Sequence, residues 1–199
     1  MSKELLHTPE GVRDVYGKEC ARKLTIENKI NNIFNLYGFH NVQTPTFEFF
    51  DIFNKERGSV PSKNLYKFFD REGNTLVLRP DLTPSIARIA AKNYMDVNVP
   101  IKLCYNANTY INNSEWHGKR KEITQLGCEL IGDDSVEADA EMVALVVNSL
   151  KSAGVDKFLV EIGQVDFYKG LLEECGFEDD VEEELRVRIE NKNFFGVEE

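Results

Sequence analysis

Two long β-rich runs, 101–110 and 120–131, stand on either side of a polar loop, and they constrain the fold more than any other feature. Such a spacing predicts a pair of long strands. Shorter strand signals occur before this pair, and helical patterns lie between them. Antiparallel strands with segregated helices are typical of an α+β domain rather than a doubly wound parallel sheet. Neither a G-x-x-x-x-G-K-[ST] nor a G-x-G-x-x-G phosphate loop is present.

The segment 18–37 predicts an amphipathic helix that Gly38 ends. Its apolar stripe consists of Ile26, Ile30, Ile33, Phe34 and Tyr37. The segment 38–48 that follows is rich in β-formers but contains Pro45, which cannot donate a ladder hydrogen bond. We therefore interpret it as an edge or interface strand.

Two short runs, 66–70 and 75–79, flank Arg-Glu-Gly-Asn and predict a hairpin. A helix should follow, with Asp81 or Thr83 as its cap and Pro84 at its first position.

A further helix is expected to open at Asp134, with Glu137 three residues later, and to end at Gly154. The apolar face predicted for it consists of Ala140, Val143, Ala144, Val147 and Leu150. The run 158–162 predicts another strand, and the tail from residue 167 is helical and acidic in pattern. We divide the chain into a body over 1–165 and a helical acidic segment over 166–199.

Composition limits the possible classes of function. Apolar residues make up 42% of the chain and charged residues 29%, which is globular usage. The sequence contains no apolar run long enough to span a bilayer, and the N-terminal residues lack the apolar core of a signal peptide, so we expect a cytoplasmic location without a membrane partner. The net charge of −10 opposes binding to a phosphate backbone, and the basic cluster at 119–121 is too short to counter it.

The cysteines and histidines predict no metal site. Cys20, Cys104, Cys128 and Cys175 are far apart in sequence, without a C-x-x-C pair or a histidine at ligand spacing. We expect them to be reduced and buried.

The stretch 121–131 carries the most informative polar pattern. Side chains alternate along a strand, so Thr124, Leu126, Cys128 and Leu130 should share an apolar core face. On the other face Gln125 and Glu129 flank Gly127, with their Cα atoms about 13 Å apart. The missing side chain of Gly127 could leave a floor for a small ligand. Alternatively, Gly127 marks a bulge and the two polar side chains face water.

Asp81 and Thr83 form a second candidate pair. A residue at the start of a helix can present a carboxylate or a hydroxyl toward a neighbouring strand. The structural alternative is that either residue only caps its helix.

Together these segments resemble histidyl-tRNA synthetase and its paralogue, the regulatory subunit of the short-form ATP phosphoribosyltransferase. The resemblance covers nearly the whole chain. It runs through Thr8–Tyr16, Tyr37–Glu48, Leu78–Ser85, Asn108–Gly132, Gly163–Leu172 and Asn191–Glu199. It implies a class II aminoacyl-tRNA-synthetase-like antiparallel sheet flanked by helices, and a homodimer through the motif 1 region at Tyr37–Glu48. The chain ends before the positions of the second histidine motif and motif 3, so we expect a truncated chain that lacks one wall of the site.

The resemblance also implies roles for individual residues. It makes Asp81, Thr83, Gln125 and Glu129 the ligands of histidine. At the position of the arginine that holds the α-phosphate of ATP in the synthetases, this sequence has Ile111, which cannot stabilise developing charge. Two further ATP contacts are replaced as well: Asn113 stands at a glutamate position, and Ile123 stands where an aromatic residue stacks on adenine.

The function implied is that of a non-catalytic subunit of a glycosyltransferase. We expect a regulatory subunit of ATP phosphoribosyltransferase in histidine biosynthesis that binds histidine and controls a separate catalytic subunit, without catalytic residues, cofactor or metal. tRNA is an unlikely partner on charge grounds. Two alternatives stay open: an active histidine-tRNA ligase, and a class-II-like module for amino-acid sensing or protein interaction.

Overall fold

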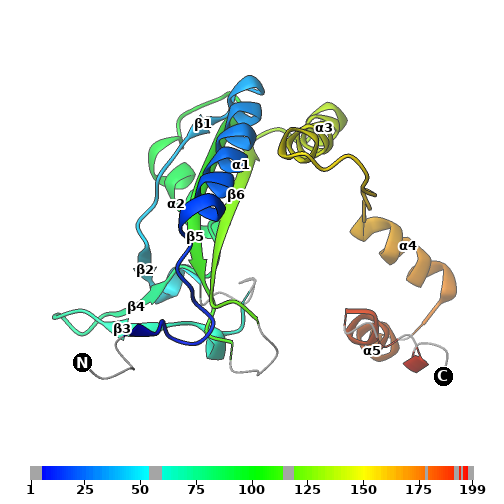
Figure 1. The fold of residues 1–199 in the computed structure, drawn as a ribbon. Helices are drawn as coiled ribbons and strands as arrows, with labels where there is room; N and C mark the ends of the chain where they lie inside the picture. Colours follow the sequence, from blue (N-terminus) through cyan, green and yellow to red (C-terminus); the bar gives the residue numbers. More distant parts are fainter. Residues whose placement is uncertain are drawn as a thin grey trace. The chain divides into compact units, whose positions relative to one another are not determined.

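The computed structural model describes residues 6–53, 60–113, 119–177, 179–190, 193, 195 and 196. Two compact units divide the chain, Met1–Lys157 and Phe158–Glu199. The division falls earlier than the boundary after residue 165 that the sequence suggested. Figure 1 shows the elements of each unit in chain order.

The first unit is built on a long antiparallel pair of strands. β5 (Ile101–Tyr110) and β6 (Glu122–Ile131) pair over their whole length, from Ile101 opposite Ile131 to Tyr110 opposite Glu122. The short β1 (His40–Asn41) adds to the other side of β5 in parallel. The predicted strand pair is confirmed, and the loop residues 114–118 lie outside the described residues.

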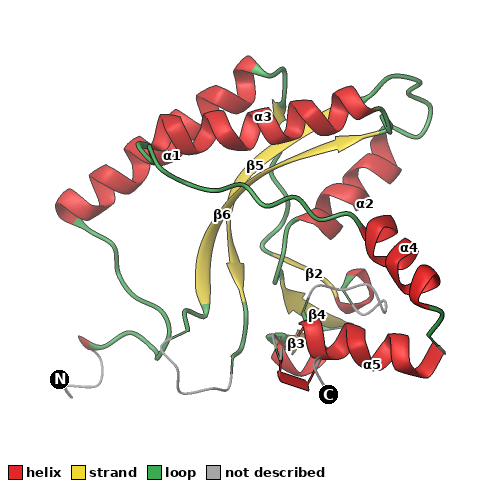
Figure 2. Cartoon of the chain, turned by 90° about the vertical axis from the view of Figure 1, so that its right-hand side faces the viewer, coloured by secondary structure: helices red, strands yellow, loops and turns green. Residues whose placement is uncertain are grey.

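Helices cover both faces of this sheet (Figure 2). α1 (Gly17–Leu36) and α3 (Val136–Ala153) pack on one face, where Phe34, Leu145 and Cys104 form a buried cluster. Leu126, Cys128 and Leu130 of β6 pack against that cluster, so the predicted core face of β6 is confirmed. α2 (Thr83–Asn93) packs on the opposite face, where its Ile86 joins a second cluster of Leu82, Leu103 and Tyr105.

A second small sheet has the order β2 (Phe47–Phe49), β4 (Thr75–Leu78) and β3 (Lys67–Phe69), with all pairs antiparallel. The predicted hairpin of β3 and β4 is confirmed. Its turn is held by Asp70, whose Oδ1 accepts from the backbone N–H groups of Glu72 and Asn74. Two short 3-10 turns, Phe50–Ile52 and Ser62–Asn64, flank the sheet.

The segment 38–48 does not form one strand. It contributes β1 to the edge of the first sheet and β2 to the edge of the second, with Pro45 between them. The edge position was predicted, but the division was not. A proline without an N–H group suits the unpaired stretch where the chain passes from one sheet to the other.

Two details of α3 differ from expectation. Its N-cap is Ser135, whose side chain accepts from the backbone N–H of Ala138, rather than Asp134. Gly154 ends the helix as predicted, with φ of 95°. The residues that face the sheet cluster are Ala138, Met142, Leu145 and Ser149, which lie on the other side of the helix from the predicted face. Because α3 has apolar residues on both sides, the periodicity of the sequence does not identify the side that packs on the sheet, and the predicted face was wrong.

The second unit consists of α4 (Val165–Cys175) and α5 (Asp179–Glu190), as the helical pattern of the tail predicted. The predicted strand at 158–162 is wrong: these residues have no regular structure, and Leu159 and Ile162 are exposed. A strand needs a neighbour to complete its hydrogen bonds, and the described residues of this unit form only helices. Across the described parts of both units, no helix is long and apolar enough to cross a membrane.

The cysteines are free, as expected, but not all are buried. Cys104 is buried and lies directly opposite Cys128 in the β5–β6 ladder. Burial raises the pKa of both thiols. Cys175 is exposed on α4, which contradicts the expectation for that residue.

Arg79 joins the two sheets of the first unit. Its guanidinium, on a residue only 6% exposed, donates to the backbone oxygens of Thr44 (2.8 Å), Pro45 (3.0 Å) and Asn108 (2.8 Å). Its own backbone oxygen accepts from the N–H of Tyr110 at 2.9 Å. One side chain therefore satisfies carbonyl groups from two segments distant in sequence, and it fixes the chain just before Asp81.

An ion pair supports the same junction. Glu48 of β2, itself buried, accepts from the guanidinium of Arg88 on α2, with a shortest distance of 2.6 Å. The pair ties α2 to the second sheet.

We predict that Arg79→Met lowers the free energy of unfolding by about 3 kcal/mol, because three backbone carbonyl groups lose a charged donor inside the protein. Urea denaturation followed by circular dichroism measures this change. The matched control is Arg71→Met in the exposed turn of the β3–β4 hairpin, which should change stability by less than about 0.5 kcal/mol. Equal stability of the two variants would contradict the anchoring role.

Candidate functional site

The four predicted ligand residues come together where the start of α2 faces the middle of β6. The hydroxyl of Thr83 donates to Oε1 of Glu129 at 2.8 Å. The amide nitrogen of Gln125 donates to Oδ1 of Asp81 at 3.1 Å. These are long-range contacts between α2 and β6, so the two candidate pairs recognised separately in the sequence form one polar cluster.

Asp81 and Thr83 do not cap α2. The helix has Leu82 as its N-cap and shows no side-chain capping hydrogen bond. Asp81 instead accepts from the N–H of Leu82 at 2.7 Å and from Gln125, and Thr83 turns toward β6. The simple capping alternative is therefore wrong for both residues.

Tyr105 is a member of this cluster that sequence reasoning missed. Its hydroxyl donates to Oε1 of Glu129 at 3.2 Å, so the same carboxylate oxygen receives both Thr83 and Tyr105. Tyr105 lies directly opposite Gly127 in the β5–β6 ladder. The pairing of an aromatic residue with a glycine across the two predicted strands was the signal that could have found it.

The role of Gly127 differs from both readings of the sequence. The ladder is continuous through Gly127, so the residue marks no bulge. A Cβ atom there would lie 2.4 Å from the hydroxyl oxygen of Tyr105 and 2.5 Å from its Cζ. The space that the glycine leaves is therefore filled by the tyrosine ring rather than open as a floor for a ligand.

The electrostatics of the cluster keep Tyr105 protonated. Burial raises the pKa of its hydroxyl, and the nearby carboxylates of Glu129 and Asp81 raise it further, against an opposing hydrogen bond with Thr83. A protonated phenol can donate to a carboxylate. Tyr105 and Thr83 therefore act as donors that satisfy one oxygen of Glu129.

The three positions at which the family resemblance implies replaced ATP contacts lie at the outer end of the long hairpin. Ile111 follows β5 directly, and its backbone N–H donates to the oxygen of Lys121 at 2.9 Å. Asn113 is half-buried at the edge of the described chain, and Ile123 is 48% exposed on β6. These side chains are apolar or neutral, so none of the three brings a charge to this end of the sheet.

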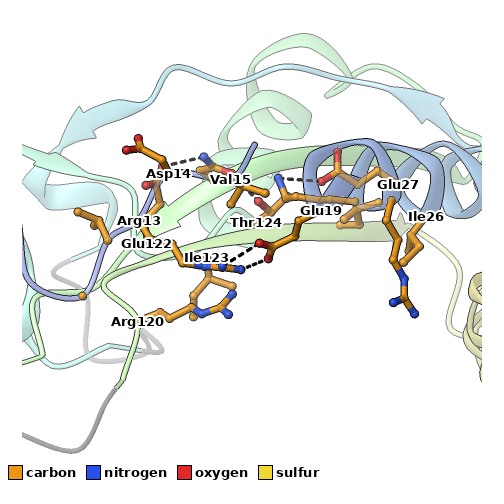
Figure 3. A pocket seen from close by; sticks show the side chains of 16 residues that line it. Arg13, Asp14, Val15, Glu19, Ile26, Glu27, Arg120, Glu122, Ile123 and Thr124 are labelled. Carbon is orange, nitrogen blue, oxygen red and sulfur yellow. Dashed lines mark hydrogen bonds and ion pairs between the residues drawn. The ribbon is translucent and has the colours of Figure 1, made fainter. Parts of the chain in front are cut away.

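A cavity of about 740 Å³ lies beside this end of the hairpin (Figure 3). Its walls come from the segment 11–15, the first half of α1 and the ends of β5 and β6. Two ion pairs lie in its walls, Arg13 with Glu19 and Lys23 with Glu27, the second at 2.9 Å. Thr124 and Leu126 line it, so it opens on the α1 face of the sheet, away from Gln125 and Glu129.

A second cavity of about 430 Å³ lies along the edge of β5 and reaches Arg79, Leu82 and Tyr105. It therefore borders the polar cluster from the side of Tyr105. Within the described ranges, no group of three or more histidine, cysteine, aspartate or glutamate side chains could hold a metal ion.

The sheet carries α2 on one face and α1 and α3 on the other. This is the arrangement of a class II aminoacyl-tRNA-synthetase-like α+β fold. The sequence pattern that defines the family described as histidyl-tRNA synthetase matches residues 11–199. The chain therefore belongs to the histidyl-tRNA synthetase family.

Curated relatives carry a more specific name. A protein of Ruminiclostridium cellulolyticum named ATP phosphoribosyltransferase regulatory subunit is 46% identical over 199 residues, which is all of this chain and 48% of that protein. A protein of the same name from Acetivibrio thermocellus is 43% identical over 199 residues, which is again all of this chain and 48% of that protein. The chain thus spans about half the length of these relatives.

Solved structures agree with the fold. An ATP phosphoribosyltransferase regulatory subunit/histidyl-tRNA synthetase from Bacillus halodurans C matches with a TM-score of 0.87 and 36% identity, over 96% of this chain and 50% of that one. A histidine-tRNA ligase subunit from Alicyclobacillus acidocaldarius matches with a TM-score of 0.79 and 26% identity, over 96% of this chain and 55% of that one. The chain thus resembles the regulatory subunits in sequence and shares its fold with both groups.

We predict that Gly127→Ala lowers the free energy of unfolding by about 1–3 kcal/mol, because its methyl group overlaps the ring of Tyr105. Thermal and urea unfolding measure the change. Gly163→Ala is the matched control, since nothing lies within 4 Å of a Cβ atom at that position.

The same substitution made together with Tyr105→Leu separates the overlap from other effects. The atoms that the new methyl group meets belong to the phenol end of Tyr105, which leucine lacks. The additional cost of Gly127→Ala should therefore be smaller in the Tyr105→Leu background. A strictly additive double variant would show that the tyrosine ring is not the cause.

Proposed function

We propose that this chain forms the histidine-binding part of a non-catalytic regulatory subunit of ATP phosphoribosyltransferase, which acts in histidine biosynthesis. One observation carries the proposal. The side chains of Asp81, Thr83, Gln125 and Glu129 converge on one place, whereas Ile111 replaces the phosphate-holding arginine that the family resemblance leads us to expect.

The polar cluster has the donors and acceptors that a bound amino acid needs. Two carboxylates, Asp81 and Glu129, suit an ammonium group and an N–H group of an imidazole ring. The side-chain amide nitrogen of Gln125 donates to Asp81, and its carbonyl oxygen is available as an acceptor. Histidine carries an ammonium group and a ring N–H, and so it matches this set.

Activation of an amino acid requires more than a pocket. Adenylate formation develops charge on the α-phosphate, and a neutral side chain at Ile111 cannot stabilise that charge. The buried guanidinium of Arg79 does not replace the missing one, because Thr44, Pro45 and Asn108 engage it through their backbone oxygens. The residues therefore favour binding without activation.

Regulation by such a pocket needs a second state of the assembly. Histidine can shift an equilibrium only if it binds the two states with different affinity, and the coupling is reciprocal. In our proposal the second state belongs to a complex with a separate catalytic subunit. The chain also forms a homodimer through the segment 37–48 in this proposal, and its net charge of −10 disfavours tRNA as a partner.

For the pocket we predict that isothermal titration detects L-histidine binding to the intact protein, and that Glu129→Ala and Gln125→Ala weaken it by roughly tenfold or more, because each removes a hydrogen bond to the ligand. Glu137→Ala on the exposed side of α3 is the control and should bind as the wild type does. Unchanged affinity in both pocket variants would remove the assignment of the site.

The rival activity, histidine-tRNA ligation, makes an opposite prediction. It requires ATP–pyrophosphate exchange that depends on histidine, and we expect none above background from the intact protein, because Ile111 lacks the charge that holds the α-phosphate. Robust exchange that is abolished by Glu129→Ala would establish the ligase instead. Capture of the phosphoribosyltransferase catalytic chain by the intact protein would exclude a free-standing sensing module.

A further inference from the structure

We propose that Tyr105 is a positioning residue that sets the ligand selectivity of the pocket. This role rests on the histidine-binding function proposed above. The hydroxyl of Tyr105 fixes Glu129 in one orientation. That orientation presents the second carboxylate oxygen as an acceptor for a ring N–H group. Tyr105 thereby favours ligands with a donating ring over ligands of the same shape without a donor.

The hydrogen bonds of Glu129 are unequal. Oε1 accepts from the hydroxyl of Thr83 at 2.8 Å and from the hydroxyl of Tyr105 at 3.2 Å. Oε2 has no hydrogen-bond partner within the part of the chain that the structure describes. Two donors from different elements, α2 and β5, thus restrain the carboxylate, and Oε2 is the oxygen that can accept from a ligand.

The ring of Tyr105 has little room to move. It packs in the buried cluster with Leu82, Ile86 and Leu103, and Tyr105 is only 4% exposed. Its phenol end occupies the space over Gly127, where a Cβ atom would overlap it. The hydroxyl therefore reaches Glu129 from a fixed direction, as a residue that supports a binding group must.

The direction of donation is also fixed. The titratable groups that act on the hydroxyl, Glu129 and Asp81, are both carboxylates that favour the neutral phenol. A neutral phenol beside a carboxylate donates its proton to the hydrogen bond. The hydroxyl therefore holds Oε1 and leaves Oε2 as the free acceptor.

Selectivity follows from an unpaired acceptor. A site built to accept a hydrogen bond rejects a ligand that lacks the donor, because its own polar group is then buried without a partner. A ligand such as β-(2-thienyl)-L-alanine has a five-membered ring of similar shape but no ring N–H. If the carboxylate of Glu129 can rotate, its oxygen no longer stays unpaired beside the thienyl ring. The cost of binding that ligand then falls, and the affinities of the two ligands become more similar.

The experiment compares the dissociation constants of L-histidine and β-(2-thienyl)-L-alanine for the intact protein by isothermal titration. The selectivity is the dissociation constant of β-(2-thienyl)-L-alanine divided by that of L-histidine. Tyr105→Phe keeps the ring and removes the hydroxyl, and it should lower this ratio by roughly fivefold to tenfold. Tyr94→Phe is the matched control, since Tyr94 packs against the same cluster but is not one of the two residues whose hydroxyl donates to Glu129. It should leave the ratio unchanged.

A second variant tests the same carboxylate from its other side. Thr83→Val removes the other hydroxyl that donates to Oε1 of Glu129, and it should also lower the ratio. A wild-type ratio in Tyr105→Phe, with histidine still bound, overturns the role of Tyr105 and leaves the proposed function intact. Absence of histidine binding by the wild-type protein overturns both.

Discussion

The hydrogen bonds of Arg79 are the interaction on which the arrangement of the first unit depends. A guanidinium offers several donors in a fixed plane, and here they meet backbone oxygens from the segment between β1 and β2 and from β5. The carbonyl groups of Thr44 and Pro45 belong to the segment that leaves one sheet and enters the other, where neither residue is part of a strand. Because Arg79 stands two residues before Asp81, the same contacts determine where α2 begins over β6. A buried structural contact thereby sets the geometry of the polar cluster.

A second constraint comes from the opposite side of the cluster. Tyr105 and Gly127 are cross-strand partners, and the ring of one occupies the space that the other leaves. Aromatic residues over glycine restore packing that a strand glycine otherwise lacks. The polar end of that ring reaches Glu129, so the apolar cluster under α2 and the polar cluster at its start share one side chain. Packing and hydrogen bonding are therefore not separable at this position, and a change at Gly127 acts on both.

The sequence predicted those elements whose pattern leaves one solution. The long strands 101–110 and 122–131 alternate clearly, so their pairing and the core face of β6 could be inferred, and Gly73 and Gly154 marked a turn and a helix end. Prediction failed where the pattern allowed two solutions or depended on a distant partner. α3 is apolar on both sides, and only its neighbours select the side of Leu145. Residues 158–162 have a strand pattern, but the described residues of their unit include no strand that could pair with them. The contact of Tyr105 with Glu129 required the register, which alternation along β6 alone does not give.

The contrast between the two ends of the β5–β6 hairpin is the physical basis for our view of the function. Toward its middle, Asp81 and Glu129 bring carboxylates to one place, which favours a cationic amino acid and disfavours a triphosphate. Toward its outer end, Ile111 and Ile123 bring no charge with which to compensate that repulsion. The net charge of −10 adds to that repulsion. The amino-acid pocket that we propose in such surroundings would discriminate its ligand without activating it, and discrimination alone is sufficient to bias an equilibrium between two states of an assembly.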